Sequence, residues 1–381
     1  MAKIGVYGGT FNPVHKMHVE LLQSVKAEFN LDKIIVVPTF ITPLKQTWGM
    51  ASCLDRLNML KLAFENTPYV EVSDYEINNQ GKSYTYLTIE HFKNLYKNDS
   101  LFFILGVDSF NTFLSWKNPQ KIVENAQIIY CDRQNCKVNL LDAENRFFNA
   151  FNKRAIKSNY VGKDVSSTKI RVLKSLNLPC NDLLTTSVEE YIDNKGLYLN
   201  EYYSYIKVNL KESRIIHTAG VIYCALQKQQ ETNLDPYKIV TACALHDIAK
   251  YLDYNNFKDF NRPSDMPDAV VHAFLGAHYA KTVLNICDQD ILNAIKYHTS
   301  GRPNMSTLEK LVFTADMVEE NRTYKEVTML REHYEVSLEQ GFYHCLEEEL
   351  LHLIRRDAKI YSLTQQAYDF YKQKREEQND K

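Results

Sequence analysis

The sequence has no apolar run long enough to cross a membrane. A membrane-spanning helix needs about 18 or more consecutive apolar residues, and no such run occurs in the 381 residues. The N-terminus enters a strand-like pattern at once, without the basic and apolar segments of a secretory signal peptide. We therefore expect a cytoplasmic protein that has no membrane partner.

A strong charge of one sign and paired cysteines are also missing. The 45 Lys and Arg and 47 Asp and Glu residues give a formal net charge of −2, which argues against a nucleic acid as the main partner. The eight cysteines contain no CxxC pair. Cys131 and Cys136 could be called half of a zinc site, but no second pair follows them. We interpret the cysteines as mostly buried thiols in a reducing compartment.

The two halves of the chain differ in their hydrophobic pattern. Up to about residue 200, short apolar runs alternate with helical patterns, which predicts a doubly wound α/β domain with a parallel sheet covered on both faces. These runs are residues 3–8, 33–38, 101–106 and 126–131. Beyond residue 200 only helical patterns occur. We predict an α/β domain over residues 1–200 followed by an all-α domain over residues 201–381.

A glycine-rich turn with two histidines follows the first apolar run. Its sequence is Gly8-Gly9-Thr10-Phe11-Asn12-Pro13-Val14-His15-Lys16-Met17-His18. A strand, a glycine turn and a helix N-terminus in that order form an anion site from backbone N–H groups and the helix dipole. His15 and His18 share a helix face because they are three residues apart. No HExxH pattern supports a metal site here, so we interpret both as imidazole donors to a triphosphate.

This segment resembles the (G)GTF[DN]PxHxGH signature of the nucleotidylyltransferase superfamily. Ser166-Ser167-Thr168-Lys169-Ile170-Arg171 resembles its second signature, SSTxIR. The chain between them is similar to bacterial nicotinate-nucleotide adenylyltransferase, and the resemblance covers roughly residues 3–199. The stretches that carry it are Pro43-Leu44-Lys45, Asp55-Arg56-Leu57 with Met59-Leu60, Ser83-Tyr84-Thr85, and Gly106-Val107-Asp108 followed by Trp116.

The resemblance implies a Rossmann-like fold and transfer of AMP from ATP to nicotinate mononucleotide, which releases pyrophosphate and serves NAD biosynthesis. The phosphate of the mononucleotide is the nucleophile, so catalysis consists of positioning and charge neutralisation with Mg²⁺. The expected charge-stabilising residues are His15, His18, Lys45 and Arg171. The expected ATP- and substrate-binding residues are Gly8, Gly9, Thr10, Phe11, Asn12, Tyr84, Thr85, Gly106, Asp108, Trp116, Ser166, Ser167 and Thr168.

Some of these residues have a plainer interpretation. Trp116 is expected to stack on the pyridine ring, with a core or interface tryptophan as the alternative. Asp108 is expected to accept hydrogen bonds from a ribose or adenine edge, or else to cap a helix after Gly106. Met17 replaces the glycine of the family between the histidines, and Leu87 replaces Asp or Asn. Neither change removes a charge-stabilising group, so we expect activity to survive.

The second half contains an adjacent His246 and Asp247 within a helical apolar run. Burying an ionisable pair without partners is costly, so a metal ion or an ion network is expected. His217 and Asp316 lie far away in sequence on either side, and imidazole with carboxylate suits Fe, Mn, Co or Zn. The alternative is a pair of residues that cap a helix or form ordinary hydrogen bonds.

The order of these residues resembles the HD phosphohydrolase superfamily. Three further stretches are similar to the bacterial HD-domain hydrolase of diadenosine tetraphosphate, over about residues 204–365. They are His272 with Gly276-Ala277, Lys296-Tyr297-His298-Thr299-Ser300-Gly301-Arg302, and Thr314-Ala315-Asp316. Ser300 and Ala273 depart mildly from the pattern of that family.

The resemblance implies hydrolysis of diadenosine tetraphosphate to two ADP by a metal-activated water. The expected ligands of Fe or another divalent transition metal are His217, His246, Asp247 and Asp316. The residues expected to bind the nucleotide or a second metal are Lys250, His272, His298 and Arg302, each with a surface or capping role as the alternative. We expect no such role for His278 or His352.

The whole chain is therefore expected to be a bifunctional enzyme that handles ATP, nicotinate mononucleotide and diadenosine tetraphosphate. One alternative is an HD domain that hydrolyses another nucleotide or only senses nucleotides, although the complete His and Asp set argues against a sensor. Another is a transferase acting on nicotinamide mononucleotide or on a different acceptor such as phosphopantetheine. The sequence leaves the metal and the oligomeric state open.

Overall fold

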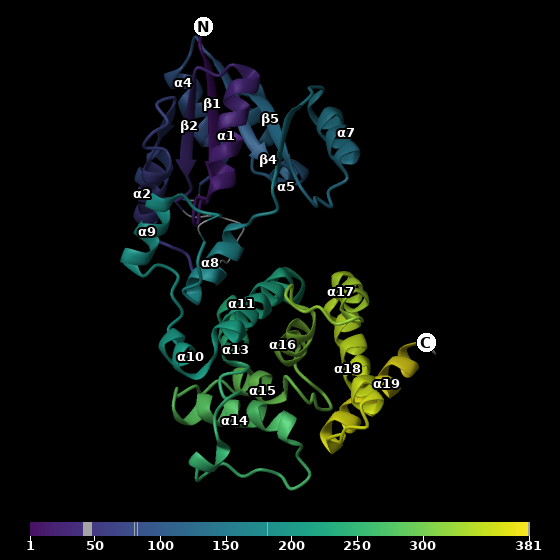
Figure 1. Cartoon of the computed structure of the whole chain (residues 1–381). Helices are drawn as coiled ribbons and strands as arrows, with labels where there is room; N and C mark the ends of the chain where they lie inside the picture. The colour runs from purple at the N-terminus through teal and green to yellow at the C-terminus, as the bar shows by residue number, and fades with distance from the viewer. Residues whose placement is uncertain (41–47, 80, 82, 181, 380–381) are drawn as a thin grey trace. The chain divides into compact units, whose positions relative to one another are not determined.

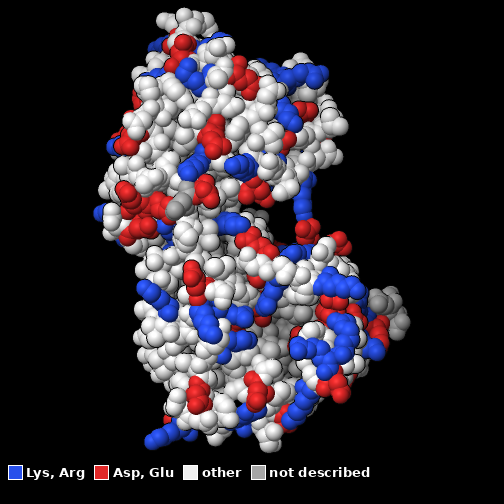
Figure 2. Space-filling view, viewed as in Figure 1, with Lys and Arg blue, Asp and Glu red and all other residues white. Residues whose placement is uncertain are grey.

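The computed structural model describes residues 1–40, 48–79, 81, 83–180 and 182–379, and the chain forms two compact units (Figure 1). Unit 1 comprises residues 1–174 and 179–198, and unit 2 comprises residues 175–178 and 199–381. None of the helices in the described part of the chain combines the length and apolar character that a membrane span requires. Figure 2 shows basic and acidic side chains interspersed over the visible surface.

Unit 1 is built on a parallel sheet whose described strands have the order β3-β2-β1-β4-β5-β6. They are β1 (Lys3–Gly9), β2 (Lys33–Pro38), β3 (Val70–Val72), β4 (Ser100–Gly106), β5 (Gln127–Arg133) and β6 (Ile156–Gly162). The order reverses between β1 and β4, and ligands of such sheets bind beyond the carboxyl ends of the strands at this switch point. The glycine turn follows β1 and Asp108 follows β4, so the fold brings both to this edge. The doubly wound parallel sheet predicted from the sequence is confirmed.

Both faces of the sheet are covered by helices. Successive residues of β2 point to opposite faces, so Ile34 and Val36 join one core whereas Ile35 and Val37 join the other. The helices packed in the first core are α1 (Lys16–Phe29), α2 (Cys53–Ala63), α8 (Ser167–Ser175) and α9 (Thr186–Lys195). Those in the second are α4 (Thr85–Leu95), α5 (Val107–Asn111), α6 (Pro119–Asn125) and α7 (Leu140–Phe151). Two short elements complete the unit, α3 (Tyr75–Asn78) and η1 (Phe113–Ser115).

Unit 2 is helical, with no strand among its described residues, as the sequence predicts. Its first elements are α10 (Tyr203–Asn209), α11 (Glu212–Gln227), α12 (Gln229–Thr232), α13 (Pro236–Leu245), η2 (Tyr254–Asn256) and α14 (Asp268–Thr282). The others are α15 (Gln289–Tyr297), α16 (Thr307–Val318), α17 (Val327–Val336), α18 (Leu338–Arg355) and α19 (Ser362–Asn379). Helix α16 is central, because it packs against α11, α13, α15, α17 and α18 (Figure 1). Its buried residues include Leu308, Leu311 and Val312.

Candidate anion site and metal centre

The glycine turn after β1 is fastened by bonds to its carbonyl oxygens. The Thr39 N–H donates to the carbonyl oxygen of Gly9 at 3.0 Å. The hydroxyl of Ser167, at the start of α8, donates to the carbonyl oxygen of Pro13 at 2.9 Å. This second bond joins the two predicted phosphate-binding motifs, which are far apart in sequence. The carbonyl groups are thus turned toward the protein, as an anion-binding turn requires.

Two buried arginines hold the carbonyl oxygens in the middle of the turn. Arg56 on α2 donates from Nη1 to the carbonyl oxygen of Thr10 at 2.8 Å. Arg171 on α8 donates from Nη1 to the carbonyl oxygen of Asn12 at 2.7 Å. The sequence predicted Arg171 as a charge-stabilising group but gave Arg56 no role. The structure places both guanidinium groups on the protein side of the turn.

The backbone of the turn is locally strained at Phe11. This residue has φ 49°, in the left-handed region that non-glycine residues seldom adopt. A Cβ added to Gly9 would lie 3.0 Å from the Phe11 ring, so this position favours glycine. The ring packs edge-on against His18, with centroids 5.2 Å apart. The strained turn therefore supports one of the two predicted catalytic histidines.

His15 and His18 lie stacked at the start of α1. Their ring centroids are 3.7 Å apart and the planes differ by 27°. The backbone N–H of His15 donates to Nδ1 of His18 at 3.1 Å, so the proton of a neutral His18 ring is on Nε2. Burial lowers the pKa of His15 to about 4, and burial together with the charge of His15 holds the pKa of His18 well below its usual value. Both rings are therefore neutral donors near pH 7.

The SST motif lies at the N-terminus of α8. Ser166 Oγ accepts from the Lys169 N–H at 3.2 Å, and Thr168 Oγ1 accepts from Nη2 of Arg171 at 3.2 Å. The Nε of Arg171 donates to the carbonyl oxygen of Trp48 at 3.0 Å. The structure thus brings this helix N-terminus to the glycine turn, in the arrangement that favours a bound anion.

The predicted acceptor-binding residues lie on the segments that follow β3 and β4. Trp116 is half-buried against Phe113, with ring centroids 5.4 Å apart. Tyr84 occupies the N-cap position of α4, whose first residue is Thr85, but its side chain forms no capping hydrogen bond. Lys117 links the two segments, because its Nζ lies 4.4 Å from the Tyr84 ring centroid. Trp116 is therefore partly a core residue, with part of its ring still accessible.

Four other residues singled out from the sequence differ in their burial and contacts. Asp108 lies in the first turn of α5 after Gly106 and is exposed, with a carboxylate oxygen 3.1 Å from Nε of Arg133. Met17 is buried, and its sulfur lies 3.9 Å from the hydroxyl of Tyr160 on β6. Leu87 is exposed. Lys45 lies outside the described residues.

In unit 2 the four predicted metal ligands come together. His217 is on α11, His246 and Asp247 follow α13 directly, and Asp316 is on α16. His217 Nε2 lies 2.9 Å from Asp316 Oδ1, and His246 Nε2 lies 3.9 Å from the same oxygen. His246 Nε2 is also 3.5 Å from Asp247 Oδ2. Two sets of ligand atoms that could hold a metal ion lie within 4.8 Å of one another, namely His217, His246 and Asp316, and His246, Asp247 and His298.

The donor atoms fit a metal ion. The Nδ1 atoms of His246 and His298 each lie 2.7 Å from a backbone carbonyl oxygen, so these nitrogens carry the protons and the Nε2 lone pairs face the cluster. His217 Nε2, His246 Nε2 and Asp247 Oδ1 are buried without a hydrogen-bond partner among the described residues. Each of them lies at ion-pair distance from another polar atom of the site, namely Asp316 Oδ1, Asp247 Oδ2 and His272 Nε2 respectively, but without hydrogen-bond geometry. A cation between them would satisfy all of them.

The electrostatics of the cluster suit a divalent cation at His246, His272 and the two aspartates. At His217, by contrast, burial is outweighed by the carboxylates of Asp316 and Glu319, which raise the pKa of the ring. Burial lowers the pKa of His246, and it lowers the pKa of His272 to about 4. Burial opposes ionisation of Asp247 and Asp316, but the histidines around them hold the pKa of both carboxyl groups below the usual value. Neutral imidazoles and ionised carboxylates are the forms that bind metals.

Glu319 is a site residue that the sequence analysis missed. It is buried and lies 3.0 Å from Nδ1 of His217, and it accepts from the Asn321 N–H at 2.7 Å. A side chain on Gly220 would collide with its carboxylate. Such partners fix the orientation of a metal-binding histidine. The available signal was spacing, because Glu319 is three residues after Asp316.

Three partly exposed cations contact the carboxylates of the cluster. Arg214 Nη1 donates to Asp247 Oδ2 at 2.9 Å, and Lys250 Nζ lies 3.5 Å from Asp247 Oδ1. Arg322 donates to Asp316 Oδ1. Only Lys250 was predicted. Arg214 was detectable, because it lies three residues before His217 and so shares its helix face.

His272 and His298 lie beside the cluster as predicted, whereas Arg302 has another partner. The Nε2 atoms of the two histidines are 3.1 and 3.6 Å from Asp247 Oδ1. The guanidinium of Arg302 forms a two-bond ion pair with the buried Glu309, at 2.8 and 2.7 Å. This contact with a residue outside the ligand cluster corresponds to the structural alternative for Arg302.

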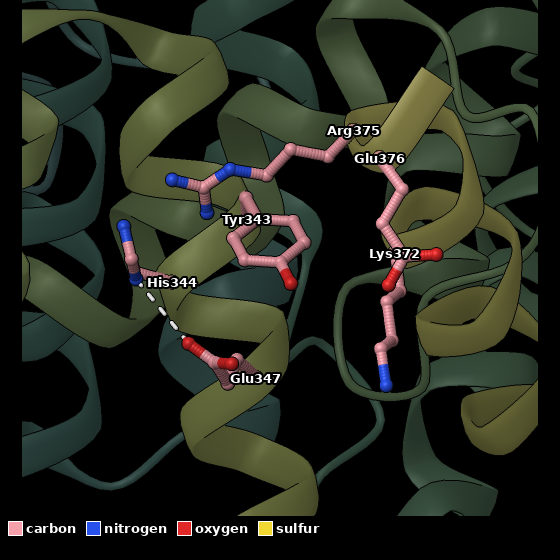
Figure 3. Close-up of a pocket in the computed structure, with 6 residues that line it drawn as sticks. All are labelled: Tyr343, His344, Glu347, Lys372, Arg375 and Glu376. Atoms are coloured by element: carbon pink, nitrogen blue, oxygen red, sulfur yellow. Dashed lines mark ion pairs between the residues drawn. The ribbon is translucent and has the colours of Figure 1, made fainter. Parts of the chain in front are cut away.

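A separate pocket of about 360 Å³ lies between α18 and α19 (Figure 3). The guanidinium of Arg375 lies over the ring of Tyr343, 4.2 Å from its centroid, and His344 Nδ1 is 3.3 Å from Glu347. The lining residues are Tyr343, His344, Glu347, Lys372, Arg375 and Glu376. None of them belongs to the metal-ligand cluster.

Comparisons with known proteins match the two units separately and together. A cytidylyltransferase-like family model matches residues 6–173, and an HD domain model matches residues 214–321. A probable nicotinate-nucleotide adenylyltransferase of Aquifex aeolicus is 39% identical over 166 residues, which are 43% of this chain and 98% of that protein. A Mycoplasma genitalium protein, named a probable nicotinate-nucleotide adenylyltransferase/Ap4A hydrolase, is 28% identical over 335 residues, 85% of this chain and 89% of that protein.

Among solved structures, an HD superfamily hydrolase of Clostridium acetobutylicum, described as involved in NAD metabolism, has 29% sequence identity and a TM-score of 0.40, covering 44% of this chain and 93% of that one. The match to the Mycoplasma protein spans 85% of this chain and therefore extends over parts of both units. The chain belongs to the nicotinate-nucleotide adenylyltransferase family and carries an HD domain behind the transferase unit.

Proposed function

We propose that unit 1 transfers the adenylyl group of ATP to nicotinate mononucleotide, giving the deamido dinucleotide and pyrophosphate. The observation that carries this proposal is the junction of the glycine turn, the stacked histidines and the N-terminus of α8. It concentrates backbone N–H groups, helix dipoles and imidazole N–H donors at one edge of the sheet. The family relationship supports the choice of substrates.

In this reaction a phosphate oxygen of the mononucleotide attacks the α-phosphorus of ATP. The new P–O bond forms as the bond from the α-phosphorus to the bridging oxygen breaks, and pyrophosphate leaves with the electron pair. Negative charge grows on the phosphoryl oxygens during the step. His18 can donate from Nε2 to these oxygens, and the turn with Ser166–Thr168 would hold the β- and γ-phosphates. Mg²⁺, which accompanies ATP, would neutralise part of the charge.

The acceptor is tested by comparing mononucleotides. We expect kcat/KM with ATP to be at least about tenfold higher for nicotinate mononucleotide than for nicotinamide mononucleotide, because one unfavourable contact of about 1.4 kcal/mol gives that factor. Dinucleotide and pyrophosphate formation would be measured under identical conditions. Phosphopantetheine serves as the control acceptor. Equal rates with acid and amide would contradict the choice of nicotinate.

We further propose that unit 2 hydrolyses a phosphoanhydride, with diadenosine tetraphosphate as substrate. His217, His246, Asp247 and Asp316 would hold a divalent transition metal, which supplies a low-pKa water as nucleophile. The water oxygen attacks a phosphorus of the central anhydride, the bridging P–O bond breaks, and two ADP and a proton are released. Arg214, Lys250 and Arg322 are placed to neutralise the polyphosphate, since they already contact the carboxylates there.

The products test this assignment. The full chain, loaded in turn with Fe²⁺, Mn²⁺, Co²⁺ or Zn²⁺, is expected to convert diadenosine tetraphosphate to ADP as the sole nucleotide product, measured by chromatography. Chelator-treated protein is the control and should be inactive, because the water nucleophile depends on the metal. Formation of AMP and ATP would contradict central cleavage. No turnover with any of these ions would contradict hydrolysis of this substrate.

A further inference from the structure

Arg56 and Arg171 differ from the other buried basic residues of the chain. They are 2% and 3% exposed. Their hydrogen-bond partners among the described residues are backbone carbonyl oxygens and, for Arg171, one threonine hydroxyl. Neither forms an ion pair with a carboxylate in the part of the chain that the structure describes. Two cations without a carboxylate in ion-pair contact therefore lie in one small region of unit 1, where the buried Glu76 interacts with Arg56 only from a longer range.

The other buried basic residues of the described ranges each have a carboxylate partner. Lys174 contacts Glu189 and Asp193, at 2.7 and 2.9 Å. Lys228 and Lys310 are paired with Glu231 and Glu339. A buried charge without a counter-ion is unfavourable, and burial indeed lowers the pKa of Arg56 and brings that of Arg171 to about 10. Among the described residues, the two arginines therefore lack the ion-paired carboxylate that each of these lysines has.

Arg56 connects the turn to two further segments of the chain. Its Nη1 bonds to Thr10, its Nη2 to the carbonyl oxygen of Phe40 at 3.2 Å, and its Nε to that of Ala51 at 3.4 Å. It thus joins the segments that follow β1 and β2 to the start of α2. Its guanidinium is bonded to a carbonyl oxygen of the turn and its side chain is buried, so little water screens its charge.

We propose that Arg56 is a positioning residue whose buried charge, with that of Arg171, sets the affinity of unit 1 for polyphosphates, the bound triphosphate being the missing counter-ion. The inference rests on the proposed adenylyl transfer. In this proposal Arg56 acts through the turn without touching the ligand. Because the interaction is electrostatic, its contribution to the binding free energy grows with the number of negative charges on the phosphates. A purely structural role would affect all nucleotides to the same degree.

The test compares ATP with AMP in the full-length protein. Arg56→Gln is expected to weaken ATP binding about tenfold and AMP binding about threefold, because AMP carries about half the charge of ATP. Arg56→Lys, which keeps the charge, should retain the ATP-to-AMP ratio of the native protein. Lys174→Met is the matched control, a buried cation with its own counter-ions, and should leave that ratio unchanged. Dissociation constants would be measured by calorimetry.

A second variant makes the electrostatic potential at the glycine turn more positive, the opposite of the effect of Arg56→Gln, and leaves Arg56 in place. Glu76 is buried, and burial raises its pKa while Arg56 lowers it. Glu76→Gln removes a negative charge near Arg56, so it should strengthen ATP binding more than AMP binding. This variant decides the question alone if Arg56→Gln fails to fold.

The outcomes separate the inference from the function. Equal weakening of ATP and AMP in Arg56→Gln, or no relative gain for ATP in Glu76→Gln, would overturn the positioning role while leaving adenylyl transfer intact. A native protein that binds no ATP would instead remove the proposed function, and the inference with it.

Discussion

His18→Ala is expected to lower kcat for adenylyl transfer by about 10²- to 10³-fold, the usual effect of removing one donor to a developing negative charge. The ring lies stacked on His15 with Nδ1 occupied by a backbone N–H, so its Nε2–H is the group available to the phosphoryl oxygens. Because the interaction strengthens as charge grows, KM for ATP should change much less than kcat. Initial rates of pyrophosphate release would be measured.

The matched control for this variant is His91→Ala. His91 also stacks on a ring in unit 1, that of Tyr75 at 3.8 Å, but it lies on α4 outside the glycine turn. Its replacement should leave kcat within about twofold of the native value. A His18→Ala enzyme with nearly native kcat and a raised KM would show that the ring binds ATP without stabilising the transition state.

Asp247→Asn is expected to abolish the metal site and lower phosphoanhydride hydrolysis by at least about 10³-fold. The carboxylate is buried among His246, His272 and His298 and supplies the negative charge of the group that it forms with His246 and His298. The amide has nearly the same shape but no charge to hold a divalent cation. Metal content after dialysis would be measured by elemental analysis, and ADP formation by chromatography.

Asp268→Asn serves as the control for this change. Asp268 is also an ion-paired carboxylate of unit 2, but it is exposed and contacts Arg262 away from the cluster. Its metal content and rate should match the native protein, because exposed pairs contribute little. Full metal retention in Asp247→Asn would mean that the cation, if bound, lies elsewhere.

The sequence predicted best those features of the fold and the sites that depend on local residue patterns. The four apolar runs predicted β1, β2, β4 and β5, whereas β3 and β6 were not predicted. The glycine turn with His15 and His18 marked the edge of the sheet. The set of His217, His246, Asp247 and Asp316 was predicted from family resemblance, and the helices bring these four residues together. In each case the residues that form the candidate site belong to the motif itself.

Contacts made across the fold could not be predicted in the same way. Arg56 belonged to a recognised stretch, yet only the structure shows its bond to Thr10. The ion pair between Arg302 and Glu309 forms because two segments meet in space. From the sequence alone, Arg302 was a charge within a functional motif and was therefore predicted to contact a ligand. Long flexible cations reach several partners, and their spacing in sequence does not decide among them.

Met17 is a departure from the family pattern whose side chain the structure accommodates. A methionine between the two histidines suggested altered nucleotide packing, because the family has glycine there. In the structure the side chain is buried, with its sulfur near Tyr160 on β6. A flexible thioether fills such a gap readily. The effect of this residue on acceptor preference remains a prediction.

The most direct test measures both reactions in both single variants, His18→Ala and Asp247→Asn, from one preparation of each. If phosphoanhydrides are handled at two independent sites, the first variant loses adenylyl transfer and keeps hydrolysis of diadenosine tetraphosphate, and the second shows the reverse. A variant that loses both reactions while remaining folded, or one that loses neither, would contradict the account.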